Sequence, residues 1–175
     1  MSTKVNKLAL AIGAMAMVGT AMAATDTANL TVNASVANAC AIGPATLNFG
    51  ALGLVVNAGA GTVGVNGNND ADTGATMSVV CTNGASATIG GDLGLNAMGS
   101  VRKMISGADL LSYELYADAG YSTVLDNASG VIAYTGTGAA TTTDRVYGRI
   151  TAAQLAAAKK GTYADTVALT ITYTP

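Results

Sequence analysis

The sequence contains little of what enzymes and nucleic-acid-binding proteins depend on. None of its 175 residues is histidine or tryptophan, Glu114 is its single glutamate, and charged residues make up 10% of the chain. Acid–base and metal chemistry use histidine and carboxylate side chains at defined spacings, so we expect no catalytic activity, no cofactor and no metal centre. The net charge of −2 provides no basic surface for nucleic acid. We therefore expect a non-catalytic protein that does not bind nucleic acid.

The first residues are typical of an export signal. Lys4 and Lys7 flank the start of an uncharged apolar run over residues 8–19, and Ala-Met-Ala at 21–23 has the small-x-small pattern of a cleavage site. The apolar run covers about 12 residues, whereas a helix that spans a bilayer needs about 20. We predict that residues 1–23 are a removable signal peptide and that the mature chain has no transmembrane segment.

Export changes the expected state of the two cysteines, Cys40 and Cys81. In an oxidising compartment, a pair of cysteines with no others in the chain is expected to form one disulfide rather than remain as two buried thiols. Closing a loop of about 40 residues would stabilise the fold by roughly 4 kcal/mol in the chain-entropy description. We predict a structural disulfide between Cys40 and Cys81.

The hydrophobic pattern of the chain has a period of two, which is typical of strands. Apolar and polar residues alternate over residues 28–36 and again over 167–173, which predicts two half-buried strands. Further short strands are expected at 46–49, 76–81, 85–89, 112–117, 130–134 and 145–150. Glycine, asparagine and aspartate clusters, which favour turns, separate these segments. This spacing predicts an all-β sandwich or barrel.

Two segments depart from the strand pattern. Residues 151–159 have a helical composition and predict one or two helical turns within a connection. Residues 50–74 are rich in glycine, asparagine and aspartate, and we interpret them as a long, partly extended connection. The two cysteines flank this connection, so a single domain is favoured.

Two short motifs lie in that connection. Residues 59–64 match the dinucleotide pattern G-x-G-x-x-G, but the asparagines and aspartate that follow cannot open the helix that a pyrophosphate site needs. Asn68, Asp70 and Asp72 alternate like the start of a calcium loop, without its glycine and closing glutamate. We interpret the first as a glycine loop and the second as a solvated turn, and we leave open whether residues 66–72 bind a cation.

A third motif, Ser100 to Lys103, fits the S-x-x-K pattern of penicillin-recognising enzymes. The S-D-N and K-T-G sequences that accompany this pattern in those enzymes are absent from the chain. We interpret Arg102 and Lys103 as a polar strand end.

The length of the first extended segment is the feature that points to a function. The 17 residues from Ala24 to Cys40 would span about 56 Å when fully extended. A compact domain of the size of the mature chain has a diameter of roughly 38 Å. One end of the segment must therefore overhang or fold back. Residues 24–34 contain no proline, glycine or lysine, the residues that commonly protect a strand from edge association.

We predict that this overhang donates a strand to a sheet of another molecule. The donating side chains would be those of Ala28, Leu30, Val32 and Ala34. Their burial with main-chain hydrogen bonds would be worth roughly 5 kcal/mol. The acceptor would be a sandwich that lacks one strand, because the chain ends at Pro175 directly after its last predicted strand. The inward residues of that strand, Val167, Leu169, Ile171 and Tyr173, would form the edge of the acceptor groove.

Several short segments, in this order, resemble those of the spore coat protein U family, which includes Csu-type subunits of archaic chaperone-usher pili. They are Cys40-Ala-Ile-Gly43, Leu47-Asn-Phe49-Gly50, Met77-Ser-Val-Val-Cys81, Arg102-Lys-Met104, Leu111 to Asp118, Val146 to Ile150 with Gln154, and Gly161 to Val167. The resemblance covers essentially the whole mature chain.

The resemblance implies an incomplete immunoglobulin-like sandwich that is completed by the N-terminal strand of a neighbouring subunit. It implies three kinds of partner: neighbouring copies and other pilus subunits, a periplasmic chaperone and an outer-membrane usher. The expected protein is a one-domain shaft subunit of a cell-surface pilus, exported through the periplasm and active in adhesion and biofilm formation. The alternative is a monomeric exported β-sandwich that binds a small ligand or a glycan through its loops.

Overall fold

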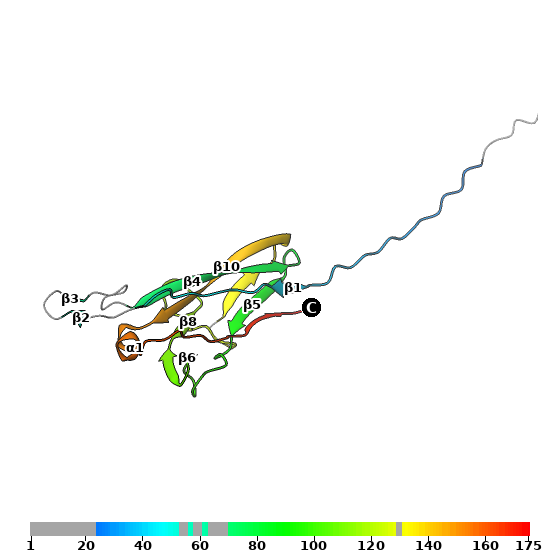
Figure 1. Ribbon diagram of the computed structural model, residues 1–175. Coiled ribbons are helices and arrows are strands. Elements are labelled where there is room, and N and C mark those ends of the chain that lie inside the picture. The colour runs from blue at the N-terminus through cyan, green and yellow to red at the C-terminus, as the bar shows by residue number, and fades with distance from the viewer. Residues whose placement is uncertain (1–23, 53–55, 58–60, 63–69, 129–130) are drawn as a thin grey trace, which may run out of the picture. The chain divides into compact units, whose positions relative to one another are not determined.

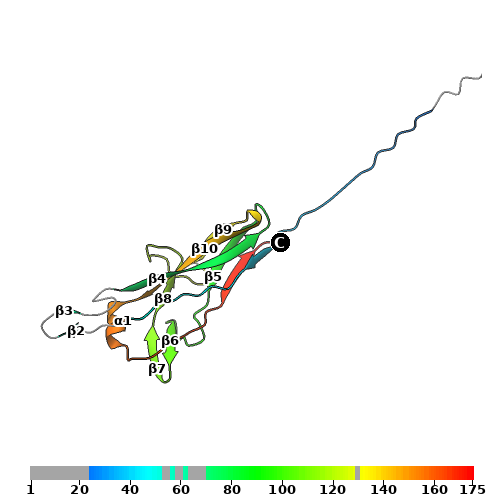
Figure 2. The same ribbon diagram turned by 45° about the horizontal axis from the view of Figure 1, so that its top comes forward.

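Two antiparallel sheets form the main body of the protein (Figures 1 and 2). The computed structural model describes residues 24–52, 56–57, 61–62, 70–128 and 131–175, so the predicted signal peptide lies outside the described residues. The chain divides into two units, Met1–Ser35 and Val36–Pro175. All strands of the described chain lie in the second unit. The predicted ranges of a donor segment, 24–34, and a pilin domain, 35–175, stay predictions.

The first sheet has four strands in the order β1-β4-β10-β8. These are β1 (Cys40–Ile42), β4 (Ala71–Cys81), β10 (Gly138–Ile150) and β8 (Glu114–Tyr116). The long strands β4 and β10 pair from Ala71 opposite Ile150 to Cys81 opposite Gly138, with a register shift between Gly138 and Thr142. Gly138 lies at this irregularity with a φ of 92°, a left-handed backbone conformation that glycine adopts readily.

The second sheet has three strands in the order β11-β5-β9. These are β11 (Leu169–Tyr173), β5 (Ser86–Gly91) and β9 (Ile132–Thr135). Two further ribbons are β2 (Val56–Asn57) with β3 (Gly61–Thr62), and β6 (Lys103–Ser106) with β7 (Asp109–Ser112). The described chain is therefore all-β apart from one short helix, which confirms the predicted fold class.

That helix is α1 (Ala152–Ala157), which lies inside the predicted segment 151–159. Thr151 caps its start: the Thr151 hydroxyl accepts from Gln154 N at 3.3 Å, and Gln154 Oε1 accepts from Thr151 N at 2.7 Å. This reciprocal pair satisfies two backbone donors that a helix start leaves unpaired. Leu155 is the buried residue of α1 and packs into the core.

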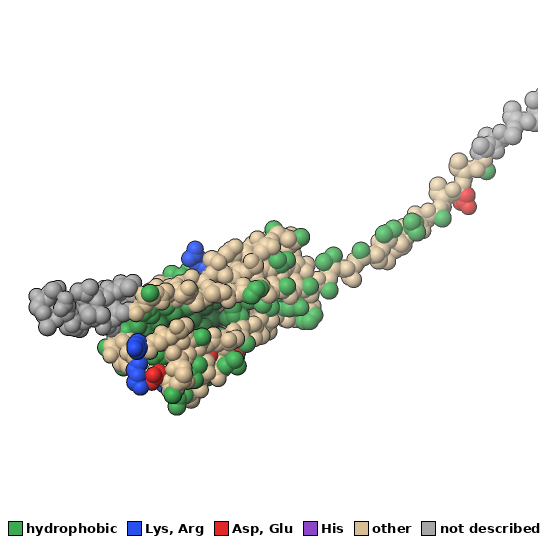
Figure 3. All heavy atoms as spheres, in the orientation of Figure 1, with side chains coloured by type: hydrophobic (Ala, Val, Ile, Leu, Met, Phe, Trp, Pro, Cys, Tyr) green, Lys and Arg blue, Asp and Glu red, His purple; other side chains and the backbone are tan. Residues whose placement is uncertain are grey.

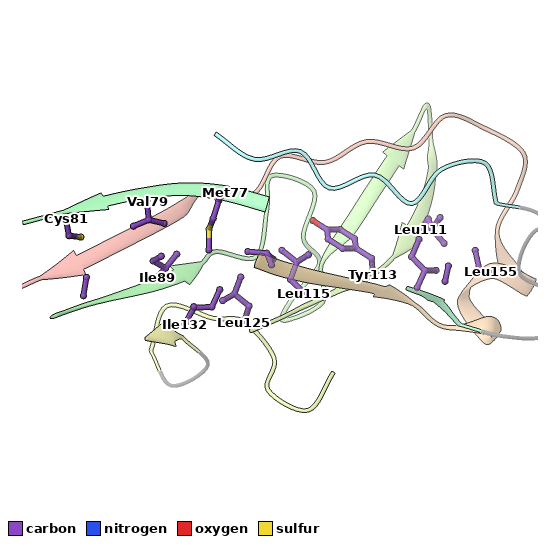
Figure 4. Packing of buried hydrophobic residues seen from close by; sticks show 14 of the residues in the cluster. Met77, Val79, Cys81, Ile89, Leu111, Tyr113, Leu115, Leu125, Ile132 and Leu155 are labelled. Atoms are coloured by element: carbon purple, nitrogen blue, oxygen red, sulfur yellow. The ribbon is translucent and has the colours of Figure 1, made fainter. Parts of the chain in front are cut away.

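The core lies between the two sheets, and alternation along the strands builds it. On β4, Ala71, Ala75, Met77, Val79 and Cys81 are buried, whereas the intervening residues face outward or are half-buried. Ile89 of β5 and Ile132 of β9 face them from the second sheet (Figure 4). The two apolar faces bury each other, as in other sandwiches.

Most of the predicted strands exist, but their ends and partners differ from the prediction. The segments 76–81, 85–89, 112–117, 130–134 and 145–150 contain strands. The prediction is wrong for 28–36 and 46–49, which contain no strand, and for 71–74, which belong to β4 rather than to the connection. Alternation reports which face of an extended segment is apolar, whereas a strand also needs a partner for its backbone hydrogen bonds.

The interpretation of Arg102 as a polar strand end is also wrong, because this side chain is 1% exposed. Its Nη2 donates to the carbonyl oxygens of Leu125 at 2.6 Å, Asp92 at 2.7 Å and Gly91 at 3.1 Å, and its Nε donates to Asp92 O at 2.9 Å. Its Nη1 pairs with the Glu114 carboxylate. The guanidinium thus joins the end of β5, the edge strand β8 and the segment around Leu125, where strands leave carbonyl groups without ladder partners.

We predict that Arg102→Met lowers the free energy of unfolding by about 3–5 kcal/mol, because it leaves a carboxylate and several carbonyls without their donor. Arg102→Lys should recover little of this loss, since one ammonium cannot replace the planar fork of donors. Chemical denaturation followed by circular dichroism measures both. Arg145→Met, at an exposed position of β10, is the matched control and should change stability by less than about 0.5 kcal/mol. Equal losses at both positions would contradict the assignment.

The structure contains the predicted disulfide, with Cys40 and Cys81 facing each other as a register pair of β1 and β4. It ties a three-residue edge strand to the long strand beside it. We predict that the Cys40→Ala/Cys81→Ala double variant loses about 2–4 kcal/mol of unfolding free energy. Dithiothreitol should bring the unmodified protein to the same stability and leave the variant unchanged. The prediction would be contradicted if the unmodified protein kept its stability after mass spectrometry had confirmed that the disulfide was reduced.

Candidate strand-acceptor groove

Each sheet ends in an edge strand, and these two edges lie next to each other. β1 is one edge of the first sheet and β11 is one edge of the second. They run side by side, as Figure 2 shows, without a hydrogen-bonded ladder between them in the described chain. At one end, Asn38 Nδ2 donates to Thr174 O at 2.8 Å and connects the two edges. From there the edges continue toward α1.

The backbone of β11 presents unused hydrogen-bonding groups on the side away from β5. Asp92 N donates to Ala168 O at 3.1 Å, and the register continues with Thr170 opposite Gly90. In an antiparallel ladder the residues that bond one neighbour alternate with those that point away. The backbone groups of Leu169, Ile171 and Tyr173 therefore point away from β5.

The same alternation applies to β1. Thr82 N donates to Ala39 O at 2.9 Å, and Gly43 N donates to Ser78 O at 2.8 Å. The backbone groups of Cys40 and Ile42 between them consequently point away from β4. Two rows of backbone donors and acceptors thus border the gap between the sheets, which is the arrangement that a further strand could bridge.

A mainly apolar cavity of about 400 Å³ lies where these edges separate, between the segment that follows β1 and the segment that leads into β11. One wall carries Leu47 and Phe49, which follow β1, and the opposite wall carries Val167 and Leu169. The floor is formed by side chains of the first sheet and its neighbours: Ala75, Met104, Tyr113, Leu115 and Val146. In Figure 3 a continuous strip of hydrophobic side chains lines the hollow on this face. We call the space between these walls the acceptor groove.

The groove continues toward α1 as a second hollow of about 690 Å³. The two hollows share Leu47, Phe49, Met104 and Tyr163. Leu155 of α1 and Leu111 of β7 line the far part. The hollow therefore extends from the start of β11 to the helix, with a mainly apolar lining near β11 and a more polar lining near α1, where Lys159 and Lys160 contribute.

The wall that leads into β11 is fixed to the body by hydrogen bonds on its outer side. Ile105 N donates to Ala164 O at 2.9 Å, and Ala164 N donates to Ile105 O at 3.1 Å. Leu95 N donates to Thr166 O at 3.1 Å. These bonds hold residues 164–166 against β6 and the loop after β5, so the opposite side of this wall is the one that faces the groove.

A polar contact crosses the floor of the groove. The Tyr113 hydroxyl donates to Asp165 Oδ2 at 2.7 Å, and Asp165 Oδ1 accepts from Asn96 N at 3.1 Å and Asn96 Nδ2 at 2.9 Å. Burial raises the pKa of the Tyr113 phenol far above its usual range, and the bond to the Asp165 carboxylate raises it further. The Tyr113 hydroxyl is therefore protonated at neutral pH and donates to the carboxylate.

Of the predicted acceptor residues, Val167 and Leu169 line the acceptor groove, and Ile171 and Tyr173 continue along β11 beyond that lining. Val167, Leu169, Ile171 and Tyr173 are half-buried and pack against the core, whereas the residues between them are exposed. β11 begins at Leu169 rather than at Thr166, so Val167 belongs to the segment that leads into the strand. The opposite wall is what the sequence failed to reveal. Its apolar residues appear in the sequence as Leu47-Asn-Phe49, a pattern that predicts a strand rather than the wall of a groove.

The predicted donor residues lie in residues 24–35, which contain no strand. Leu30 is 87% exposed and Val32 is 80% exposed, and Ala28 and Ala34 are exposed as well. We call residues 24–35 the arm. The half-buried strand predicted there does not form in this chain by itself, because no other strand provides hydrogen-bond partners for it. Its role as a donor stays a prediction.

The remaining motifs add no site within the described residues. Arg149 donates to the Asp72 carboxylate from Nε at 2.7 Å and from Nη2 at 2.8 Å, so Asp72 belongs to an ion pair across β4 and β10. Asn68 and most of the glycine motif at 59–64 lie outside the described residues. Within the described residues, no group of three or more histidine, cysteine or acidic side chains could hold a metal ion. In the same part of the chain, no helix has the length and apolar character needed to cross a membrane.

Among the solved structures that align with this chain are two complexes of a chaperone with a tip subunit. One is the chaperone–tip adhesion subunit pre-assembly complex of the archaic chaperone-usher Csu pili of Acinetobacter baumannii, at 19% identity and a TM-score of 0.44, over 78% of this chain. The other is a chaperone–tip adhesin complex of CFA/I fimbriae, at 12% identity and a TM-score of 0.37, over 75% of this chain. The alignments span 40% and 42% of those chains.

Sequence comparison gives a closer match over nearly the whole length. Protein U of Myxococcus xanthus is 37% identical over 167 residues, which cover 87% of this chain and 88% of that protein. The model of the Spore Coat Protein U domain matches residues 26–170, a range that includes most of the arm and all the strands up to the start of β11. This confirms the resemblance seen in the sequence: the chain belongs to the spore coat protein U family.

Proposed function

We propose that this protein is a structural subunit of an archaic chaperone-usher pilus, polymerising by donor-strand complementation into a surface fibre. The observation that carries the proposal is the acceptor groove: an apolar hollow bordered by two edges with unused backbone groups. The same chain carries an exposed arm in which apolar and polar residues alternate. Groove and arm are complementary in chemistry and in strand character.

The energetics favour insertion of the arm of one copy into the groove of another. Leu30 and Val32 are exposed in the free arm, and burying each of them is worth about 1.5–3 kcal/mol. Main-chain hydrogen bonds to β1 and β11 would add to this and would satisfy the edge groups. Each inserted arm thus stabilises the subunit that receives it, so a free subunit is the less stable state.

The topology of the groove sets a direction for the inserted strand. β1 is antiparallel to β4, and β11 is antiparallel to β5. Because the chain reverses direction between the consecutive strands β4 and β5, β1 and β11 are also antiparallel to each other. A strand between them is therefore parallel to one and antiparallel to the other. The chain enters its own body at Asn38, beside Thr174. A neighbour's arm can enter the groove from the α1 end, with the residues that join it to its own body remaining at that end. In this orientation the arm runs antiparallel to β11.

This geometry repeats without closing. Every copy offers a groove and an arm, and a head-to-tail contact of this kind generates a filament rather than a closed oligomer. An unfilled groove is prone to nonspecific association, so we infer that a periplasmic chaperone occupies it before assembly. An outer-membrane usher would then exchange chaperone for arm, and the fibre at the cell surface would serve adhesion and biofilm formation.

We predict that removing residues 24–34 abolishes polymerisation. The mature chain purified without a chaperone should form ladders of heat-stable multimers in unboiled electrophoresis samples, whereas the truncated chain should not. The truncated chain should still show the far-ultraviolet circular dichroism of an all-β body, because the arm adds no strand to the body that it is attached to. A mature chain that elutes as a single monomeric species would instead favour the exported binding module.

A substitution within the arm tests which of its faces enters the groove. Leu30→Asp should stop ladder formation, because it places an unpaired charge in an apolar groove. Asn29→Asp, one residue away, introduces the same charge on the opposite face of the strand and should assemble close to normally. Assembly of Leu30→Asp at the level of the unmodified chain, or equal loss in both variants, would contradict the proposed donor face.

A further inference from the structure

Tyr113 contacts both walls of the acceptor groove. Its ring packs edge-on against Phe49, with centroids 6.5 Å apart and planes at 70°. Phe49 lies on the wall that follows β1. The Tyr113 hydroxyl reaches the other wall, where it donates to Asp165 at 2.7 Å. One side chain, 5% exposed, thus links the two walls across the floor.

The Asp165 end of this link is held from behind. Asn96 donates to the Asp165 carboxylate through both its backbone and its side chain. Gly94 lets the carboxylate approach closely, because a Cβ at position 94 would lie 2.1 Å from Asp165 Oδ2. The Asp165 side chain therefore has one place in the structure, and Tyr113 is held to that place.

The two walls that Tyr113 links come from different segments of the chain. The wall residues Leu47 and Phe49 belong to the segment after β1, and Asp165 and Val167 belong to the segment before β11. These segments are attached to different sheets. A charge-assisted hydrogen bond that is sheltered from water is strong enough to hold such segments at a fixed separation.

Resting on the proposed function, we propose that Tyr113 and Asp165 form a brace that fixes the width of the acceptor groove and so selects aliphatic side chains of the donor strand. They are positioning residues: they set the distance between the walls without bonding the inserted strand. The partner that this fits is the arm of a second copy. Residues 24–39 contain leucine, valine and alanine as their apolar residues and no aromatic residue.

The selection is steric. A groove of fixed width accepts leucine or valine above the brace and resists phenylalanine, because overfilling a packed space forces side chains or backbone to shift. If the brace is released, the walls can separate, so the penalty for a larger side chain falls. A residue that merely stabilised the fold would instead change the binding of all donor strands by the same factor.

The test uses the full mature chain, refolded with excess fluorescent peptide of the sequence of residues 24–38. The peptides carry the native sequence, Leu30→Phe or Val32→Phe, since these two positions lie on the same face. The readout is the ratio of native to phenylalanine peptide taken up, measured after gel filtration. We expect the unmodified chain to prefer the native peptide by roughly tenfold or more at one of the two positions.

Tyr113→Phe removes the brace hydroxyl and should bring that ratio near one. Asn96→Ala, which removes a donor that holds Asp165, should lower it part of the way and provides a second variant if Tyr113→Phe fails to fold. Asp165→Asn keeps the size of the side chain but removes the charge and one acceptor oxygen, so it should also lower the preference. Tyr134→Phe is the matched control, because the Tyr134 hydroxyl hydrogen-bonds with Thr142 between β9 and β10 and this residue does not line the groove.

The outcomes separate the two proposals. Uptake of no peptide by the unmodified chain would overturn the proposed function. Uptake with a preference that Tyr113→Phe leaves unchanged, or that Tyr134→Phe lowers equally, would overturn the brace alone. A uniform loss of uptake for all peptides in Tyr113→Phe, at an unchanged ratio, would assign Tyr113 a purely structural role and would likewise overturn the brace.

Discussion

The structure depends on one arrangement: two neighbouring sheet edges that have no strand of the described chain between them. β1 and β11 close the two sheets at the same side of the sandwich, and the apolar groove opens where they separate. Backbone groups that face such a gap need partners, and apolar walls favour burial. The disulfide ties β1 to the long strand β4 and thereby keeps one of these edges in place.

The body is arranged to hold the groove open rather than to fill it. Arg102 binds carbonyls at the end of β5 and near Leu125, and it pairs with Glu114 at the start of β8, so loops and strand ends form one rigid support. Residues 164–166 are bonded to β6 and to the loop after β5 on their outer side. The charged residues are few, and three of them, Arg102, Glu114 and Asp165, make contacts that hold the frame around the hollow.

The sequence predicted the fold class, the disulfide and most strands because these leave local signals. Alternation along residues 76–81 or 145–150 directly reflects a buried face, and two cysteines in an exported chain have one pairing. The failures share a physical cause, since they depend on partners that are distant in sequence. Residues 46–49 are extended without a ladder partner, and Arg102 is buried because separate strand ends supply its acceptors. No periodicity records such contacts, nor the contact of Tyr113 with Asp165.

Hydrogen–deuterium exchange of the assembled and the monomeric protein tests the central claim most directly. If a neighbour's strand occupies the groove, the amides of Leu169, Ile171 and Tyr173 and alternate amides of the arm become protected together on assembly, while those of β4 and β10 stay as they were. If assemblies form in which the arm and the groove edge exchange as fast as in the monomer, the subunits are joined by some other surface and the account is contradicted.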